Sequence, residues 1–369
     1  MTFGYSLKLW EKSNALERES RQFNFMSDHY GLKYWIITYG DNSDKKYENY
    51  FNNAKIIPVY SIFKESKWKI VNILKSFFFP LKLVKEIEVT KFVVKQNQLL
   101  GSWVSIIFKK LTHSSLYIRT GYDMYTFSIQ DQKSKIKIFL YRAVTYLSLL
   151  FSDIYTVSSK VDYDFIIENF RRINPNKIKV LHNWVDISSI NEFSKKEISI
   201  ISVGRLELQK NFSYLISELK GSNFKITIFG EGSLEEEIKL LARELEVDLV
   251  LSPTINNKEL LYKLKTTRFF ILSSLYEGNP KVLLEAMSSG CIVLGSNIPN
   301  NTEIINDGVD GFVFDLKKNA LNEKFKDIVN LDDNKLNQIS INAQEKISQK
   351  FGKEHILEQE LKIFSKLGI

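Results

Sequence analysis

The sequence predicts an α/β protein built from two Rossmann-like domains with parallel sheets. Its 369 residues are too many for one ordinary doubly wound unit and sufficient for two. Short runs of β-branched and aromatic residues alternate with helical patterns along the chain, which is typical of parallel α/β sheets. Hydrophobic residues make up 44% of the chain and charged residues 25%, the balance expected of a folded, water-soluble protein.

Strand and helix patterns alternate in the first half of the chain. The run YWIITY combines β-branched and aromatic side chains, as expected of a buried strand. Helices are predicted where apolar residues recur at helical spacing. The predicted strands are residues 34–39, 55–60, 115–119 and 153–157, and the clearest helices are residues 16–30 and 135–151.

The second half repeats this alternation more regularly. Its predicted strands are residues 197–203, 224–229, 248–251, 269–272 and 291–295, and its predicted helices are residues 212–220, 233–245 and 281–289. Asn, Ser, Asp and Lys accumulate at residues 186–194, which marks the junction between the halves. We therefore predict domains at residues 1–186 and 187–352, followed by a C-terminal helix at residues 353–369.

The two halves differ in charge. Residues 1–186 contain 28 Lys and Arg against 17 Asp and Glu, a net charge of +11. The remaining residues contain 23 basic and 26 acidic side chains, a net charge of −3. A basic half suggests a polyanionic neighbour, such as nucleic acid or the anionic inner leaflet of a membrane. No nucleic-acid fold or motif accompanies the charge, so nucleic acid is not expected as a partner.

Composition also excludes several kinds of site. Cys291 is the single cysteine, so no intramolecular disulfide can form, and the four histidines have no zinc-binding spacing with it. We therefore expect no metal. The N-terminus lacks the features of a signal peptide, and no apolar run approaches the length of a membrane-spanning helix. The expected compartment is the cytoplasm.

The most specific motif is YEGNPKVLLEAMSSG at residues 276–290. Gly278, Asn279 and Pro280 turn the chain into a predicted helix, with Pro280 suited to the first helical position. The amides of Asn279, Lys281 and Val282 would then point outward with the positive end of the helix dipole, an arrangement that binds a diphosphate.

Two glutamates flank this turn, eight positions apart. Glu285 is expected on the rim of the site, where it can accept hydrogen bonds from vicinal ribose hydroxyls, and Glu277 faces the sugar side of the same diphosphate. Taken alone, such a pair is more often a capping acid and a solvated helix residue. The neighbouring motif makes the binding role the better interpretation.

That second motif is VGRLELQKN at residues 203–211. A predicted strand ends at Gly204, and Arg205 and Lys210 follow within one loop. Ligands bind at the carboxyl ends of strands in such sheets. Arg can hold a phosphate bidentately and Lys supplies a point charge, whereas the simpler interpretation is a pair of surface charges.

These motifs closely resemble the donor-binding domain of glycosyltransferase family 4, retaining enzymes with the GT-B fold. The resemblance rests on Gly204-Arg205-Leu206 with Lys210, on Gly230-Glu231-Gly232, and on Glu277 and Glu285 in EGNPKVLLEAMSSG. It extends upstream to VLHNWVD at residues 180–186 and downstream to residues 303–314, about half of the chain. It implies two Rossmann-like domains facing each other across a cleft, with the acceptor bound by residues 1–186 and the nucleotide sugar by residues 187–352. We expect the helix at residues 353–369 to pack back toward the N-terminal domain.

The resemblance also implies roles for the donor-site residues. Arg205 and Lys210 would neutralise the diphosphate leaving group, Glu285 would bind ribose and Glu277 the transferred sugar. No protein nucleophile is required in this family, so the two glutamates are not expected to be the acid and base of a hydrolase. The donor would be a UDP- or GDP-linked sugar, with no cofactor or metal. The donor-binding set is Gly4, Gly204, Arg205, Lys210, Gly230, Glu231, Glu277, Gly278, Asn279, Pro280, Lys281, Val282 and Glu285.

The N-terminal half looks like a subgroup that acts in bacterial surface-polysaccharide assembly. This looser resemblance rests on GYSL at residues 4–7, on NQ and GSW within residues 97–103, and on RTGYD at residues 119–123. Many relatives have a histidine where RTGYD stands. Asp123 is therefore expected either to accept the proton of the acceptor or only to hold Arg119. The predicted acceptor-binding residues are Asn97, Gln98, Arg119, Tyr122 and Asp123.

Lysines and aromatic residues are interleaved at residues 62–85. Such a segment suits the headgroup region of a membrane, and a lipid-linked acceptor would require that contact. The alternative is an ordinary amphipathic core helix whose lysines are solvated. The expected location is therefore the cytoplasm, peripheral at the cytoplasmic face of the membrane.

Parts of the sequence also fit two rival functions. A Rossmann oxidoreductase needs G-x-G-x-x-G, but the third glycine is missing after Gly230-Glu231-Gly232. A non-catalytic relative that binds sugar nucleotide as a partner subunit is the remaining alternative, and retention of the motifs argues against it.

Overall fold

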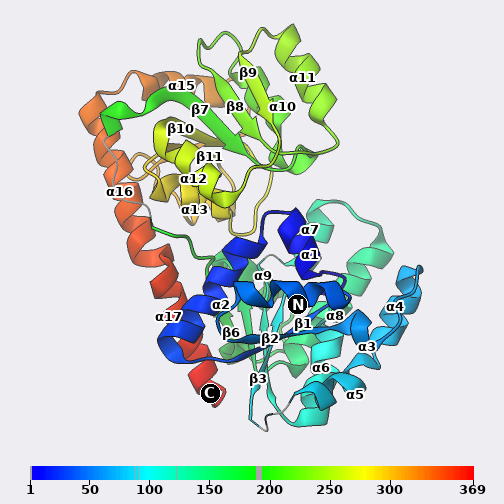
Figure 1. The fold of residues 1–369 in the computed structure, drawn as a ribbon. Coiled ribbons are helices and arrows are strands. Elements are labelled where there is room, and N and C mark those ends of the chain that lie inside the picture. Colours follow the sequence, from blue (N-terminus) through cyan, green and yellow to red (C-terminus); the bar gives the residue numbers. More distant parts are fainter. Residues whose placement is uncertain (1, 88, 90, 122, 188–192) are drawn as a thin grey trace. The chain divides into compact units, whose positions relative to one another are not determined.

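A computed structural model describes residues 2–87, 89, 91–121, 123–187 and 193–369. The chain divides into two compact units (Figure 1). Unit 1 contains Met1–Leu181 and Leu357–Ile369, and unit 2 contains His182–Ile356. Each unit is described by itself.

Unit 1 contains a four-stranded parallel sheet and a separate parallel pair. The four strands have the order β3-β4-β5-β6, and β1 pairs with β2. Asn97 at the end of β3 lies opposite Arg119 at the end of β4, so the loops after these strands are neighbours. The strands are β1 (Tyr34–Thr38), β2 (Ala54–Pro58), β3 (Val93–Asn97), β4 (Ser115–Arg119), β5 (Ile154–Val157) and β6 (Ile178–Val180).

The sequence predicted four of these six strands. It missed β3, which carries Lys95, Gln96 and Asn97 among its five residues, and β6, which is only three residues long. Neither has a long enough apolar run to be recognised without its neighbours.

Helices surround the sheets of unit 1, and α5, α6 and α8 pack in succession. The helices are α1 (Leu7–Lys12), α2 (Leu16–Tyr30), α3 (Val59–Ile62), α4 (Lys69–Ser76), α5 (Phe79–Leu83), α6 (Ser102–Thr112), α7 (Met124–Gln130), α8 (Lys135–Phe151) and α9 (Lys160–Asn169). Short 3-10 helices occur at Asn42–Tyr50, Val84–Glu86 and Pro175–Lys177.

Unit 2 has one six-stranded parallel sheet, with the order β12-β11-β10-β7-β8-β9. The strands are β7 (Glu197–Val203), β8 (Ile226–Phe229), β9 (Leu249–Ser252), β10 (Thr267–Leu272), β11 (Ile292–Ser296) and β12 (Phe312–Phe314). The chain runs outward from β7 to β9, then returns to the other side of β7 with β10. The switch point of this sheet therefore lies between β7 and β10, where ligands bind in open α/β sheets.

Both faces of this sheet are covered by helices (Figure 1). Ile200, Phe269 and Ile271 face a core completed by α10, α11 and α15, whereas Ile201 and Phe270 face a core completed by α12 and α13. Parallel strands covered on both faces confirm the predicted Rossmann-like architecture. The helices are α10 (Phe212–Glu218), α11 (Glu235–Glu244), α12 (Asn257–Thr266), α13 (Lys281–Ser288), α14 (Pro299–Thr302), α15 (Ala320–Val329) and α16 (Asp333–Phe351), with 3-10 helices η4 (Phe193–Lys195) and η5 (Leu208–Lys210).

Helix α17 (Lys353–Lys366) starts in unit 2 and continues into unit 1, where it buries one carboxylate. Glu360 is 0% exposed and pairs with Lys95 at 2.7 Å and Arg119 at 3.4 Å. It also accepts hydrogen bonds from Tyr117 at 3.0 Å and Gln22 at 2.6 Å. Burial alone would raise the pKa of Glu360, but Lys95 and Arg119 outweigh that effect and lower it to about 2.

Within the described part of the chain, no helix is both long and apolar enough to cross a membrane.

Candidate donor-binding site

The two motifs singled out in the sequence meet at the switch point of unit 2. VGRLELQKN follows β7, and YEGNPK lies between β10 and α13. Because β7 and β10 are adjacent and parallel, both loops leave the same edge of the sheet. The structure therefore brings together Gly204, Lys210 and Glu277, which are far apart in the sequence.

Lys210 and Glu277 form a largely buried ion pair. Their side chains are 13% and 8% exposed, and the Lys210 ammonium donates to Glu277 Oε1, which also accepts from Ser274 Oγ at 2.6 Å. A Cβ atom at Gly204 would lie 2.8 Å from Lys210 Cε. Glycine at this position therefore leaves the room that the lysine chain occupies on its way to Glu277.

Gln209, which the sequence analysis did not single out, joins the two loops. Its backbone carbonyl accepts from the Leu275 amide at 2.8 Å, and its side chain donates to the Tyr276 carbonyl at 2.9 Å. Its Oε1 accepts from Arg205 Nη2 at 3.1 Å, so it also orients the exposed arginine. An amide can donate to one loop and accept from the other, which a sequence pattern does not reveal.

The Gly230-Glu231-Gly232 loop after β8 packs directly on the loop after β7. The Leu206 amide donates to the Glu231 carbonyl at 3.0 Å. A Cβ atom at Gly230 would lie 1.8 Å from the Gly204 carbonyl oxygen, and one at Gly232 would lie 2.4 Å from the Leu206 carbonyl oxygen. These contacts are between backbone atoms, so no flexible side chain can move to make room. The two glycines therefore allow the loops after β7 and β8 to pack closely.

Replacing Gly230 with alanine should destabilise unit 2 by about 3 kcal/mol or more, because the added methyl group forces two backbone segments apart. Chemical denaturation of the purified variant would measure this loss. Gly221→Ala is the matched control: open space surrounds it, and only its φ of +70° costs about 1 kcal/mol. Equal losses in the two variants would contradict the close-packing argument.

The turn into α13 is held by two asparagines. Asn183 donates to Asn279 through its backbone amide at 3.1 Å and its side chain at 3.0 Å, and the Asn300 side chain donates to the Gly278 carbonyl. Pro280 is the N-cap of α13 rather than its first residue, which corrects the expected position. The first helical hydrogen bonds come from Leu283 and Leu284, so the Lys281 and Val282 amides precede the helical ladder.

Glu285 is more enclosed than the sequence suggested. We expected it on the rim of the site, but its residue is 5% exposed and its Oε1 accepts from Asn257 Nδ2 at 2.8 Å. Asn257 lies at the start of α12, the helix that packs beside α13. The packing of α12 buries a carboxylate that the sequence places on an accessible helix turn.

The predicted acceptor residues belong to unit 1. The Gln98 amide donates to the Arg119 carbonyl at 2.7 Å, and Gln98 Oε1 accepts from the Gly121 amide at 3.3 Å, so the loops containing Asn97, Gln98, Arg119 and Asp123 are adjacent. Gly4, which was predicted to bind the donor, also belongs to unit 1; it lies in the turn before α1, with φ +79°. Tyr122 lies outside the described residues.

Gln96 organises this region and was also missed. It is 3% exposed, its amide nitrogen donates to the carbonyls of Asn97, Gln98 and Leu100, and its oxygen accepts from Ser105 Oγ at 2.7 Å. One buried glutamine therefore shapes the whole turn after β3.

Asp123 is the N-cap of α7 and is 1% exposed. Its Oδ2 accepts from the backbone amide and the hydroxyl of Thr126, both at 2.8 Å, whereas its Oδ1 has no hydrogen-bond partner among the described residues. Burial raises the pKa of Asp123, and the bonds from Thr126 partly offset that effect. The ion pair of Arg119 is with Glu360.

In the described ranges, no group of three or more His, Cys, Asp or Glu side chains is placed to hold a metal ion.

Residues 186–346 match the family model described as glycosyl transferases group 1. An N-acetylgalactosamine-N,N'-diacetylbacillosaminyl-diphospho-undecaprenol 4-alpha-N-acetylgalactosaminyltransferase of Campylobacter jejuni is 30% identical over 229 residues, which are 58% of this chain and 61% of that protein. The capsular polysaccharide biosynthesis glycosyltransferase CapH of Staphylococcus aureus is 29% identical over 63% of this chain and 67% of its own length. A UDP-Gal:alpha-D-GlcNAc-diphosphoundecaprenol alpha-1,3-galactosyltransferase of Escherichia coli is 29% identical over 48% of this chain and 51% of its own length. The matches thus span about half to two thirds of these relatives.

Solved structures resemble nearly the whole chain. A glycosyltransferase from Rickettsia africae has a TM-score of 0.71 at 17% identity and covers 96% of this chain and 95% of its own. Sucrose-phosphate synthase from Thermosynechococcus elongatus has a TM-score of 0.76 at 14% identity, covering 95% and 92%. Anabaena Alr3699/HepE in complex with UDP and glucose has a TM-score of 0.71 at 15% identity, covering 90% and 91%. These likenesses show the fold, which is GT-B.

Proposed function

We propose that this chain is a retaining glycosyltransferase that moves a sugar from a nucleotide-diphosphate donor to a glycan or lipid-linked acceptor in bacterial surface-polysaccharide biosynthesis. The observation that carries the proposal is the convergence of Arg205, Lys210, Glu277 and the start of α13 at the switch point of unit 2. This convergence lies within the residues that match the group 1 glycosyl transferase model. The names of these three similar proteins are those of glycosyltransferases: one names capsular polysaccharide biosynthesis, and two name acceptors linked to diphosphoundecaprenol.

The donor diphosphate is assigned to the positive end of this site. Arg205 is exposed and held by Gln209, and Lys210 lies beside it at the carboxyl edge of β7. The first amides of α13 add the positive end of a helix dipole. As the bond to the sugar breaks, negative charge grows on the departing diphosphate, and preorganised cations and amides lower the barrier to that step.

The two glutamates are assigned to hydroxyl groups of the donor. Glu277 already accepts from Lys210 and Ser274, so it is oriented before substrate arrives and can turn its remaining acceptor capacity toward the sugar. Asn257 positions Glu285 in the same way for the ribose. The ion pair with Lys210 suits Glu277 to a role as a hydrogen-bond acceptor for the donor.

The contacts of Asp123 favour a positioning role over acid-base catalysis. One of its oxygens caps α7 and the residue is almost fully enclosed, so an acceptor hydroxyl would reach the other oxygen only after a local rearrangement. We assign Asp123 the role of holding the conformation of the acceptor loop. Arg119, adjacent to that loop and paired with Glu360, is assigned the same role.

Helices α4 and α5 are assigned to peripheral contact with the cytoplasmic face of the membrane. Asn72 and Ser76 are the buried residues of α4, whereas Trp68 is 76% exposed, Leu74 61% and Phe78 63%. In α4 the apolar side chains are the exposed ones, unlike those of an ordinary core helix, whereas α5 buries Phe79 and Leu83 in the core. Exposed aromatic and aliphatic residues beside lysines are typical of helices that lie in a membrane interface.

The proposal predicts selective stabilisation by a nucleoside diphosphate. UDP is the first ligand to test, because a similar structure contains UDP and a similar protein is named for UDP-Gal. Saturating UDP, at about a hundred times its Kd, should stabilise the folded protein by about 2.7 kcal/mol, measured as a rise in Tm. GDP and ADP are run in parallel. Glu285→Gln, which preserves side-chain size, should lose most of the rise.

A rise in Tm with GDP alone would mean that the donor carries guanosine rather than uridine. It would still support the proposed donor site. The absence of any shift, in protein that unfolds cooperatively, would contradict the donor site. A shift without release of UDP from UDP-sugars in the presence of a lipid-linked acceptor would instead support the non-catalytic alternative.

A further inference from the structure

Helix α8 of unit 1 exposes large apolar side chains on the side that faces away from the core. Its buried residues are Thr145, Ser148 and Leu149, and Ser148 Oγ donates to Ser102 Oγ on α6 at 2.8 Å. Large apolar side chains occupy the opposite side: Ile136 is 73% exposed, Phe139 69%, Leu140 54%, Leu147 44% and Leu150 46%. Ile138, Tyr141 and Leu149 of the same helix pack on the core, so α8 carries apolar side chains on both sides, whereas a helix that only covered a core would have a polar outer face.

This exposed stripe is long and uninterrupted by acidic residues. The spacing of its residues follows helical periodicity from Ile136 to Leu150, which spans about 21 Å at 1.5 Å per residue. The sequence of α8, KIKIFLYRAVTYLSLLF, contains three basic residues and no Asp or Glu. Exposed apolar surface on this scale marks an interaction site.

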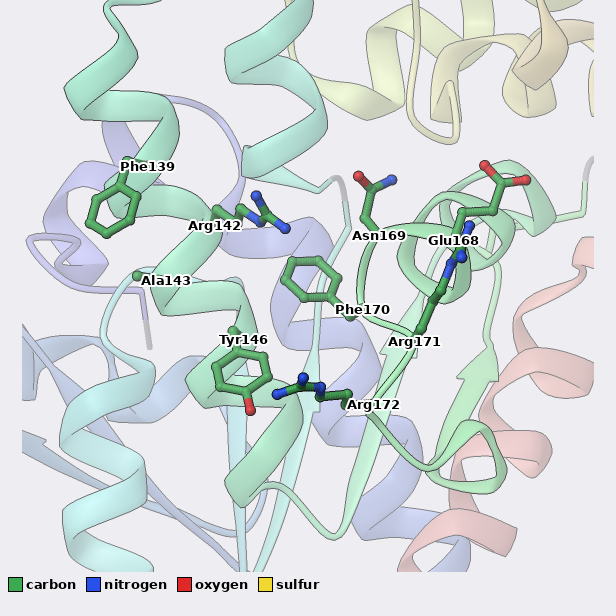
Figure 2. A pocket seen from close by; sticks show the side chains of 9 residues that line it. All are labelled: Phe139, Arg142, Ala143, Tyr146, Glu168, Asn169, Phe170, Arg171 and Arg172. Atoms are coloured by element: carbon green, nitrogen blue, oxygen red, sulfur yellow. The ribbon is translucent and has the colours of Figure 1, made fainter.

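A pocket of about 640 Å³ lies beside the stripe (Figure 2). Figure 2 shows one wall formed by α8 and the other by the end of α9 and the segment after it. Tyr146 and Phe170 stack at 6.4 Å between ring centroids and form its aromatic part. The lining residues are Phe139, Arg142, Ala143, Tyr146, Glu168, Asn169, Phe170, Arg171 and Arg172.

Three arginines line this pocket: Arg142, Arg171 and Arg172 (Figure 2). Glu168, the one acidic residue of the lining, is exposed at its edge. Three guanidinium groups beside apolar walls suit a phosphate attached to an apolar body.

We infer that the α8 stripe docks on an anionic bilayer and that Arg142, Arg171 and Arg172 bind the phosphate of a lipid headgroup in this pocket. The stripe enters the acyl boundary while the arginines remain at headgroup level, as in interfacial amphipathic helices. The net charge of +11 on residues 1–186 favours an anionic bilayer over a protein surface of mixed charge. The inference rests on the proposed function only in that a lipid-linked acceptor would bring the enzyme to the membrane. It assigns a surface on α8, separate from α4 and α5.

Vesicle co-sedimentation of the full chain tests this inference. The vesicles contain either phosphatidylcholine alone or equal parts of phosphatidylcholine and phosphatidylglycerol. The triple variant Arg142→Gln, Arg171→Gln, Arg172→Gln should bind the anionic vesicles on the order of a hundredfold more weakly, since each basic residue near such a surface contributes about a fivefold factor. The double variant Phe139→Ser, Leu147→Ser should weaken binding by about tenfold or more.

A matched triple variant of unit 2 controls for net charge. Lys258→Gln, Lys335→Gln and Lys350→Gln removes the same charge from exposed positions and should leave vesicle binding unchanged. All the substituted side chains of α8 are exposed, so Tm should stay close to that of the parent protein, and this is measured alongside.

Several outcomes would overturn the inference. Equal losses in the two triple variants would mean that only net charge matters. Binding that depends on Trp68→Ser and Leu74→Ser but not on the α8 variants would assign the membrane contact to α4 alone. A dimer that dissociates in the Phe139→Ser, Leu147→Ser variant, with vesicle binding intact, would make the stripe an interface between copies. Sugar transfer plays no part in this readout, so its failure and that of the transferase proposal are distinguishable.

Discussion

Replacing Lys210 with methionine lowers kcat/KM for sugar transfer by about 10²- to 10³-fold, the loss expected when one preorganised group that stabilises transition-state charge is removed. The ammonium group pairs with Glu277 in the loop between β10 and α13, and Arg205 lies in the same loop as Lys210 after β7, where the departing diphosphate is assigned. Methionine keeps the apolar stem that packs over Gly204 and removes only the charge. Transfer is measured as UDP release from a series of UDP-sugars in the presence of a lipid-linked acceptor.

A structural role for Lys210 must be separated from this catalytic one. Removing the lysine leaves the Glu277 carboxylate largely buried without its cation, which by itself costs stability. The double variant Lys210→Met, Glu277→Gln removes both charges and should recover most of the stability without recovering activity. Lys225→Met, at an exposed position of unit 2, is the control and should transfer sugar normally. Recovery of activity in the double variant would mean that Lys210 serves only to neutralise Glu277.

Replacing Glu360 with alanine destabilises the protein by about 3–5 kcal/mol, because Lys95 and Arg119 are left as buried cations without a counter-charge. The Tyr117 hydroxyl also loses an acceptor. Urea denaturation monitored by circular dichroism measures the loss. Glu358→Ala on the same helix is the control, since Glu358 is exposed and should cost little. A loss below about 1 kcal/mol in Glu360→Ala would contradict the buried-pair argument.

The pH dependence of stability provides a second readout for Glu360. Its pKa is about 2 in the folded protein against an ordinary 4.5, so the folded state holds the ionised form more strongly than the unfolded state does. A lowered pKa contributes stability that is fully present above pH 4.5 and is lost as the pH falls toward 2, about 3 kcal/mol in total. Glu360→Gln should show a flatter loss of stability over that window. Identical acid profiles for Glu360→Gln and the parent protein would contradict the assignment.

Five of the six strands of unit 2 and the helices α10, α11 and α13 were predicted from the sequence, whereas β12, α12, α14, α15 and α16 were not. Its long apolar runs, such as EISIISV and FKITIF, alternate with amphipathic helices, and these local patterns identify strands and helices without knowledge of their partners. The predicted start of α13 differed from the observed one by one residue: Pro280 is the N-cap rather than the first helical residue. Helix boundaries are decided by backbone geometry that a turn motif only approximates. In unit 1, β3 was missed because its polar residues serve the loop that follows it: Gln96 is buried to bind three carbonyls.

The sequence by itself determined the fold class, the two-domain organisation and the two loops of the candidate donor site, because periodicity, glycines and charged motifs are local properties of the chain. Only the tertiary structure decided which side chains position those loops: Gln209, Asn183 and Asn257 act across contacts between distant segments. It also decided the exposure of α8 and the pairing of Glu360. Burial is a property of neighbours rather than of residue type, so the same leucine or glutamate is core, surface or site according to what packs against it.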